Sequence, residues 1–351
     1  MANLRILSFG AGAIGTYIGG SLALAGEQIV FVERPSVANE LRQRGLRLNL
    51  AIDKRRKTNQ IFALSPTAFV VAPSLEDALR YGPFDAALFA LKSFDTASAL
   101  EGMKSFAEKL PPMLCLSNGV ENESTIANAL GPDKVIPGIV ASAVERRGPG
   151  DIVLERLRGI GIATSHPLSA KLLDAADSAN LNPRAFSNAA AMKWSKMLTN
   201  LIANPTSAIL NMSAAEILAN PRLYEIEIRM LRECLAVMEA QRIPVVDLPH
   251  TPVRALAFAT RLPMRISKPL LARAAGAGRG GKMPSFHIDL YSGRGESEVE
   301  YLQGAVARAG DRFGVPTPVN KILTETLMKL TNKKIPLEEF AHQPDKLLAL
   351  M

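Results

Sequence analysis

The chain has 351 residues, 48% hydrophobic and 21% charged, a balance typical of folded globular proteins and not of disordered ones. This length exceeds one ordinary core, so we expect two domains, residues 1–187 and 188–351. The net charge of +8 at pH 7 is spread along the chain instead of being gathered into one tail. Two basic stretches, residues 54–57 and 261–282, lack interleaved aromatic residues, so we interpret them as solvated loops and expect no nucleic-acid partner.

The cysteines and histidines form no recognisable site. Cys115 and Cys234 lie in separate apolar segments, and the four histidines are isolated. We therefore expect no metal site, no Ser/His/Asp triad and a reducing, cytoplasmic location. No apolar stretch approaches the ~18–20 residues that span a bilayer, and the first residues lack the pattern of a secretory signal, so no membrane association is expected.

The first predicted elements form a βαβ unit. Residues 4–9 are a short apolar run that ends at Gly10, and residues 13–25 have helical periodicity that ends at Gly26. A second apolar run, residues 28–32, follows directly. Such short connections predict two parallel strands with a helix between them.

Further alternation of strand and helix follows. Strands are predicted at residues 86–91 and 113–116, and helices around 96–110 and 123–130. This order is typical of a doubly wound, mostly parallel sheet of the Rossmann type.

The pattern changes beyond Pro137. Residues 139–144, 151–157 and 159–164 are predicted as strands, with a turn at residues 147–150. We interpret them as a meander that extends the first domain.

Helical periodicity dominates from about residue 188. The predicted helices are residues 189–204, 214–218, 221–241, 299–313 and 319–331. Residues 262–284 are rich in Gly, Arg and Lys and are predicted as a long loop. The expected fold class is therefore an α/β Rossmann-type N-terminal domain followed by a mostly α-helical C-terminal domain.

A glycine-rich turn joins the first strand to the first helix. It reads Gly10, Ala11, Gly12, Ala13, Ile14, Gly15. In this strand–turn–helix context the spacing predicts a dinucleotide-binding turn, because the glycines permit the tight turn, the close approach of a pyrophosphate and close helix packing. The alternative is a tight turn without a ligand.

The end of the second strand carries two residues with opposite indications. An acidic residue there, here Glu33, bonds the ribose 2′-hydroxyl of NAD, whereas a nearby arginine, here Arg34, accommodates the 2′-phosphate of NADP. A carboxylate in contact with that phosphate would repel it, so one of the two side chains must turn away.

Three polar residues recur every fourth position in the predicted helix 189–204. Lys196, Asn200 and Asn204 fall within about 80° of one helix face, and Pro205 then ends or kinks the helix. The pattern indicates a lined cleft, with a solvated polar stripe as the alternative. Lys193 lies only about 60° from Lys196 on the helical wheel, so periodicity does not separate the two lysines.

These segments together make the chain resemble the ketopantoate reductase (2-dehydropantoate 2-reductase) family, from about Leu4 to about Leu330. The resemblance is carried by residues 90–96 (ALKSFDT), 116–123 (LSNGVENE) and 193–206 (KWSKMLTNLIANPT). It implies that Lys92 and Asn118 contact the NADP cofactor, with Asn118 also near the substrate. Among the two lysines of the helix, it selects Lys196.

The last matching segment begins at Ser285. The resemblance implies that Ser285, Asn200 and Asn204 bind substrate and that Glu298 is a catalytic carboxylate. The chain carries about one extra residue before Glu298, so Glu296 competes for that role, but Glu298 keeps the family spacing to Tyr301.

The resemblance implies an NADPH-dependent reduction of a small-molecule 2-oxo acid, 2-dehydropantoate or a close analogue, with Lys196 as proton donor. One alternative is an NAD-dependent D-2-hydroxyacid dehydrogenase on the same scaffold, which Glu33 favours. Another is a non-catalytic NADP-sensing protein, although that function predicts a damaged catalytic helix. The oligomeric state stays open, a homodimer being one option.

Overall fold

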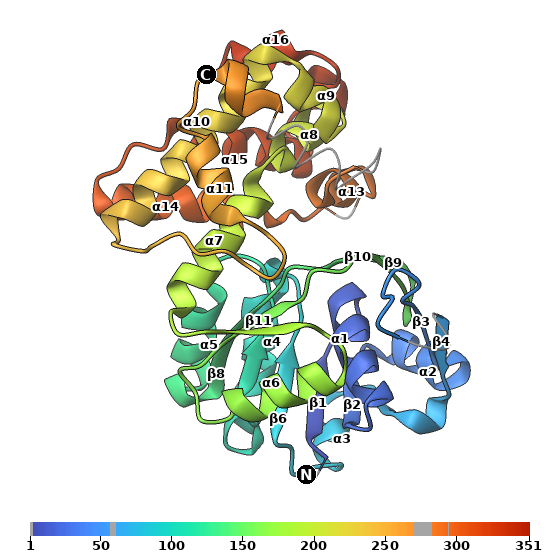
Figure 1. Cartoon of the computed structure of the whole chain (residues 1–351). Helices are drawn as coiled ribbons and strands as arrows, with labels where there is room; N and C mark the ends of the chain where they lie inside the picture. Colours follow the sequence, from blue (N-terminus) through green and yellow to red (C-terminus); the bar gives the residue numbers. More distant parts are fainter. Residues whose placement is uncertain (1–2, 57–60, 270–282, 294) are drawn as a thin grey trace. The chain divides into compact units, whose positions relative to one another are not determined.

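The computed structural model describes residues 3–56, 61–269, 283–293 and 295–351 (Figure 1). The chain divides into two compact units. The first comprises Met1–Lys193 and Leu248–Thr251, and the second comprises Trp194–Asp247 and Pro252–Met351. The division falls inside helix α7 (Ala189–Leu201), a few residues after the boundary expected between 187 and 188.

The first unit is an α/β structure. Its strands are β1 (Arg5–Phe9), β2 (Gln28–Val32), β3 (Leu46–Asn49), β4 (Ile61–Leu64), β5 (Val70–Ala72), β6 (Ala86–Phe89), β7 (Met113–Cys115), β8 (Val135–Val140), β9 (Ala143–Gly148), β10 (Asp151–Arg156), β11 (Ile160–Ala163) and β12 (Pro183–Phe186). Its helices are α1 (Ala13–Leu24), α2 (Pro35–Arg44), α3 (Leu75–Leu79), α4 (Thr96–Met103), α5 (Asn122–Leu130) and α6 (Ser169–Ser178), with short 3₁₀ turns between them.

Eight strands form the main sheet in the order β12-β11-β8-β7-β6-β1-β2-β5. Every neighbouring pair is parallel except β8 and β11. The chain order reverses direction between β1 and β6, which makes this the switch point where such sheets bind ligands. The expected mostly parallel Rossmann-type sheet is confirmed.

Both faces of the main sheet are buried, as a parallel sheet requires. Along β1, Ile6 packs into one core together with α1, α6 and the strands of a second sheet. Leu7 and Phe9, on the opposite face of β1, pack into the other core with α3, α4 and α5. Side chains alternate across a strand, so consecutive apolar residues fill both cores.

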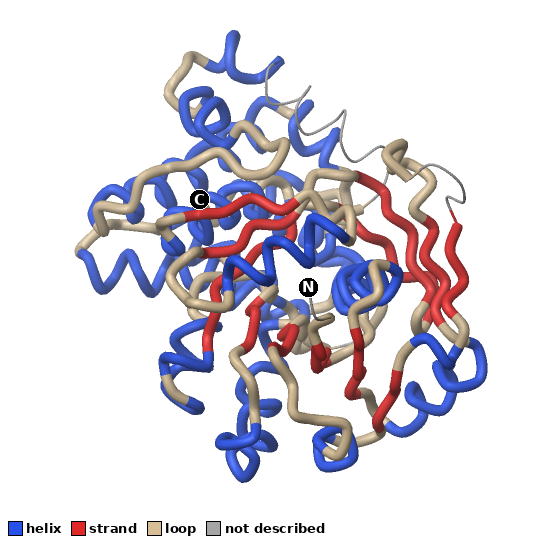
Figure 2. Tube along the Cα trace, turned by 60° about the horizontal axis from the view of Figure 1, so that its bottom comes forward, coloured by secondary structure: helices blue, strands red, loops and turns tan. Residues whose placement is uncertain are grey.

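A second sheet of four strands, β4-β3-β10-β9, makes the predicted meander wrong. β9 and β10 do form an antiparallel hairpin, but β10 pairs next with β3, and β11 returns to the main sheet beside β8. The apolar run 139–144 is thus divided between β8 in one sheet and β9 in the other. Figure 2 shows the strands of both sheets in red.

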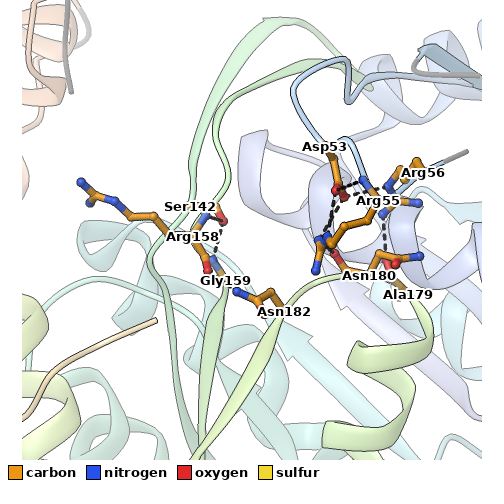
Figure 3. Close-up of polar contacts among 9 residues, drawn as sticks. All are labelled: Asp53, Arg55, Arg56, Ser142, Arg158, Gly159, Ala179, Asn180 and Asn182. Carbon is orange, nitrogen blue, oxygen red and sulfur yellow. Dashed lines mark hydrogen bonds and ion pairs between the residues drawn. The ribbon is translucent and has the colours of Figure 1, made fainter. Parts of the chain in front are cut away.

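One of the places where the chain crosses between the sheets, after β8, is held by Ser142 (Figure 3). Its hydroxyl accepts the backbone N–H groups of Arg158 at 3.0 Å and Gly159 at 2.9 Å. Gly159 has φ +137°, and a Cβ there would lie 2.2 Å from the carbonyl oxygen of Asn182. Glycine is therefore required where the outgoing and returning segments meet.

The second unit is helical, as expected. Its helices include α8 (Asn204–Leu210), α9 (Ala214–Ala219), α10 (Pro221–Ala240), α11 (Val253–Ala259), α13 (Ser285–Tyr291), α14 (Gln303–Phe313), α15 (Pro318–Thr331) and α16 (Pro344–Leu348). α10 begins with Asn220 as its N-cap, whose side chain accepts backbone N–H groups, followed by Pro221 in the first turn. Its buried face supplies much of this unit's apolar core.

Two predictions about this unit are corrected. The predicted helix 189–204 is two helices, because α7 ends at Leu201 and Ala203 has φ +52° before α8 begins. The predicted loop 262–284 contains helical residues at 264–269, while residues 270–282 lie outside the described part of the chain. Of the two basic stretches, Lys57 and residues 270–282 are likewise not described.

Candidate active site

Four turns meet at one edge of the main sheet. They follow the carboxyl ends of β1, β2, β6 and β7, which are parallel neighbours in the order β7-β6-β1-β2. The glycine sequence 10–15 follows β1, and the pair Glu33 and Arg34 follows β2. Lys92 follows β6, and Asn118 follows β7. The structure therefore brings together, within the first unit, all the residues predicted to bind the cofactor.

The glycine turn has the geometry that its residues predicted. Gly10 has φ +88°, a left-handed conformation that favours glycine. A Cβ on Gly15 would lie 1.9 Å from the Gly10 carbonyl oxygen, so that glycine is needed for packing. A Cβ on Gly12 would meet nothing within 4 Å, which leaves open space beside the first turn of α1. Open space beside a helix N-terminus fits a pyrophosphate.

Glu33 points toward the glycine turn. One carboxylate oxygen accepts the backbone N–H of Ala11 at 2.5 Å, and the other accepts the N–H of Arg34 at 3.2 Å. Arg34 itself is exposed and lies immediately before α2. The two side chains thus differ in environment, because the Glu33 carboxylate is engaged by backbone groups while the Arg34 side chain is exposed.

The turns after β6 and β7 are bonded to each other. The Ser117 hydroxyl donates to the Leu91 carbonyl at 2.8 Å, and the Ser93 hydroxyl donates to the Asn118 carbonyl at 2.8 Å. Lys92 and Asn118 are both half-buried. These two hydrogen bonds fix the turns against each other, so the backbone segments that carry Lys92 and Asn118 are held together.

The structure separates the two lysines that periodicity left together. Lys193 is 5% exposed, and its Nζ lies 2.6 Å from Oε1 of Glu123 within the first unit. Lys196, three residues later, is only half-buried and belongs to the second unit. The protons of the Lys193 ammonium are directed at a carboxylate and backbone carbonyls, whereas Lys196 is half-buried, so Lys196 remains the candidate acid.

Asn204 is the first residue of α8 and not part of the single helix 189–204 that was predicted. It is 4% exposed, and its Oδ1 accepts the backbone N–H of Phe286 at 3.1 Å. Its Nδ2 donates to the Asn200 carbonyl at 3.2 Å and lies 3.4 Å from the Ser285 hydroxyl. The structure thus brings three of the predicted substrate residues together, and Asn204 also caps the first turn of α13.

A buried glutamate that the sequence analysis did not single out holds the break between α7 and α8. Glu227, on α10, is 1% exposed. Its carboxylate accepts the Ala203 N–H at 2.7 Å and the Thr206 hydroxyl at 2.6 Å. The only signal in the sequence was a charged residue on the apolar face of a predicted helix, and such a residue is rarely buried without partners.

The two candidate carboxylates near residue 298 differ in environment. Glu298 is 2% exposed at the start of a 3₁₀ turn (Glu298–Tyr301), whereas Glu296 is exposed. Ser297 caps the turn by accepting the Val299 N–H at 3.2 Å. A buried carboxylate in a capped turn has a defined position, so the geometry favours Glu298.

Two arginines of the basic stretch, Arg55 and Arg56, have internal partners (Figure 3). Asp53, 1% exposed, lies between Arg55 and Arg56, with Oδ1 2.8 Å from Nε of Arg55. The two arginines also donate to the carbonyls of Asn180 at 2.6 Å and Ala179 at 2.7 Å, at the end of α6. The solvated-loop interpretation is therefore wrong for Arg56, which is 9% exposed.

Within the described ranges, no helix combines the length and apolar character needed to cross a bilayer.

The open glycine turn, at the switch point of a mostly parallel sheet, defines a dinucleotide-binding protein of the Rossmann class, here joined to a helical unit. Sequence profiles then specify the family. The profile "Ketopantoate reductase PanE/ApbA" matches residues 6–165, and the profile for its C-terminal part matches residues 188–331. The chain belongs to the ketopantoate reductase family, and is accordingly an oxidoreductase.

Individual relatives are distant but cover nearly the whole chain. A 2-dehydropantoate 2-reductase of Archaeoglobus fulgidus is 24% identical over 91% of this chain and 95% of its own. The enzyme of the same name from Streptococcus pyogenes serotype M6 is 22% identical over 90% of this chain and 94% of its own length.

Solved structures show the same fold. A PanE/ApbA family ketopantoate reductase from Ralstonia eutropha JMP134 has a TM-score of 0.76 and 25% identity, covering 94% of this chain and 99% of its own. A D-mandelate dehydrogenase with NADH and anilino(oxo)acetate has a TM-score of 0.72 at 20% identity. The match covers 94% of this chain and 99% of the dehydrogenase chain.

Proposed function

We propose that this protein reduces a 2-oxo acid, 2-dehydropantoate or a close analogue, to the 2-hydroxy acid at the expense of NADPH. The observation that carries the proposal is the cluster in the second unit. Asn200, Asn204 and Ser285 are joined by hydrogen bonds at the end of the helix that bears Lys196. Family membership and the named relatives support the same reaction.

The chain's own residues supply binding and proton transfer. The bound nicotinamide would supply the hydride to the keto carbon. The Lys196 ammonium would polarise the keto oxygen and then donate a proton to it as negative charge develops there. Asn200 and Ser285 would donate hydrogen bonds to the substrate's carboxylate and hydroxyl groups. Glu298 would orient either the substrate hydroxyl or the lysine.

The cofactor preference follows from the end of β2. NADPH is favoured because the Glu33 carboxylate is bonded to the backbone of the glycine turn, while Arg34 is exposed beside it. In this arrangement Arg34 would pair with a 2′-phosphate, a contact that NADH cannot make. Lys92 and Asn118 would complete the cofactor site from the neighbouring turns.

The proposal is tested by following NADPH and NADH oxidation at 340 nm with a panel of 2-oxo acids that includes 2-dehydropantoate. We expect turnover of 2-dehydropantoate or a close analogue, with NADPH preferred. Turnover of a bulkier aromatic 2-oxo acid with NADH would identify a D-2-hydroxyacid dehydrogenase instead. Tight dinucleotide binding without turnover of any 2-oxo acid would support a non-catalytic sensor.

A further inference from the structure

Lys193 occupies an unusual position for a lysine, because its ammonium lies inside the first unit. Nζ is 2.6 Å from Oε1 of Glu123 on α5. It also donates to the Ser117 carbonyl at 2.8 Å and lies 3.4 Å from the Gly138 carbonyl on β8. The ammonium is thus surrounded by oxygen atoms from three separate segments of the chain.

The amine remains charged in this position. Burial by itself would lower the pKa of Lys193, but the charge and hydrogen bond of Glu123, together with Cys115, outweigh burial and raise the pKa above its ordinary value. Burying an ion pair costs desolvation energy that the mutual attraction of the two charges only partly offsets. A pair of apolar side chains could fill the same space, so a contribution to stability alone does not explain these charges.

The Ser117 carbonyl is the contact with a consequence for the cofactor site. It directly precedes Asn118, whose own carbonyl accepts the Ser93 hydroxyl at 2.8 Å and the Asn122 side-chain amide. The turn after β7 is therefore fixed on one side by Ser93 and Asn122, and on the other by the Lys193 ammonium. Removing the ammonium takes one contact away from the Ser117 side of this turn, which also has the hydroxyl bond to the Leu91 carbonyl.

We propose that Lys193 is a positioning residue, whose ammonium, paired with Glu123, fixes the Ser117 carbonyl and thereby orients Asn118 for cofactor binding. The inference deepens the proposed function, since it rests on Asn118 belonging to the cofactor site. It assigns the two lysines of α7 separate tasks. Lys196 acts on the substrate, and Lys193 acts through the backbone of a turn.

Three variants test the proposal: Lys193→Met, Glu123→Gln, and the double variant. Lys171→Met, which removes an exposed lysine on α6 of the same unit, is the control. Two readouts are measured on the full chain without substrate. One is hydrogen exchange of the backbone amides of residues 116–123, and the other is the Kd for NADPH from its fluorescence.

In Lys193→Met we expect faster exchange in residues 116–123 and about tenfold weaker NADPH binding, the order of effect of losing one hydrogen bond to a charged group. The double variant should recover thermal stability relative to Lys193→Met, because no unpaired charge stays buried. Its exchange and NADPH affinity should stay impaired, because the Ser117 carbonyl still lacks its donor. The KM for the 2-oxo acid should change less than the KM for NADPH.

A double variant with wild-type NADPH affinity would overturn the proposal. In that case the Lys193 ammonium would neutralise the buried Glu123 carboxylate but would not position Asn118. Unchanged exchange of residues 116–123 in Lys193→Met would do the same. Neither readout depends on turnover. A wild-type protein that binds NADPH but reduces no 2-oxo acid would therefore contradict the proposed function and leave the role of Lys193 to be decided by exchange and affinity.

Discussion

Lys196 is the side chain on which the proposed chemistry depends most. Lys196→Met keeps most of the aliphatic stem but removes the charge and the proton. A general acid contributes typically about 10²–10⁴-fold, so kcat should fall by roughly that factor. The Kd for NADPH should stay near its wild-type value, because the glycine turn belongs to the other unit. Steady-state kinetics and fluorescence titration measure the two effects.

The control for that variant must be an exposed lysine. Lys193, its neighbour on α7, is unsuitable because Lys193→Met leaves Glu123 buried without its cation. Lys321→Met, on the exposed face of α15, removes a lysine charge from the same unit as Lys196. If Lys196→Met turns over as fast as Lys321→Met, Lys196 is not the acid, and Lys92 becomes the leading candidate.

At the scale of a single residue, Arg34 is the side chain that we propose selects NADPH over NADH. Arg34→Ala should weaken NADPH binding by about 10–100-fold and leave NADH binding nearly unchanged, because a charge-assisted contact is worth about 1.5–3 kcal/mol. Arg44→Ala is the matched control, since Arg44 lies on the adjacent α2 and pairs with Glu40 at 2.5 Å. Equal losses for both dinucleotides, measured by titration, would make Glu33 the selecting residue.

At the scale of elements, the break between α7 and α8 sets the positions of Asn200 and Asn204. Ala203 adopts a left-handed conformation that alanine disfavours, and the Glu227 carboxylate bonds its N–H. Glu227→Ala should lower the free energy of unfolding by about 1–3 kcal/mol, because it leaves a buried N–H and a hydroxyl without this acceptor. It should also raise the KM for the 2-oxo acid, with little change in NADPH affinity.

Glu227→Gln is the informative companion variant. Its amide can accept from Ala203 and donate to Thr206, so most of the stability and the substrate KM should be retained. Urea unfolding and steady-state kinetics measure both properties. Wild-type stability and KM in Glu227→Ala would mean that the break is held by other contacts, and the geometry of Asn200 and Asn204 would need another explanation.

At the scale of the whole molecule, Arg55 and Arg56, both paired with Asp53, connect the loop after β3 to the end of α6. Burial by itself would raise the pKa of Asp53, but the hydrogen bonds from Arg55 and the charges of Arg55 and Arg56 together outweigh burial and lower the pKa. The ion pair therefore stabilises the folded chain above the ordinary aspartate pKa. This contribution is lost as the pH falls through the lowered value.

Asp53→Asn should reduce the free energy of unfolding at pH 7 by about 1–3 kcal/mol, less than for a fully buried pair because Arg55 reaches solvent. The difference from wild type should be constant from pH 7 to pH 5 and should shrink below about pH 4, where Asp53 takes up a proton in the unfolded wild-type chain before it does so in the folded chain. Urea unfolding at several pH values measures it. A difference that grows toward low pH would contradict the assignment.

Local pattern was sufficient for much of this protein. The βαβ unit, the glycine turn and the helical second unit follow from short-range periodicity and from glycine's conformational freedom, both of which a linear sequence displays. The residues at the ends of β1, β2, β6 and β7 could be anticipated as neighbours because parallel strands present their carboxyl ends at one edge.

Only the tertiary structure decided contacts between segments distant in the chain. An apolar run does not reveal its pairing partner, so the division of residues 139–144 between two sheets was missed. Helical periodicity places Lys193 and Lys196 on nearly one face, yet burial against Glu123 distinguishes them. The break at Ala203 likewise depends on a carboxylate more than twenty residues away, Glu227. These features arise from desolvation and pairing of buried polar groups, which depend on three-dimensional neighbours and not on sequence spacing.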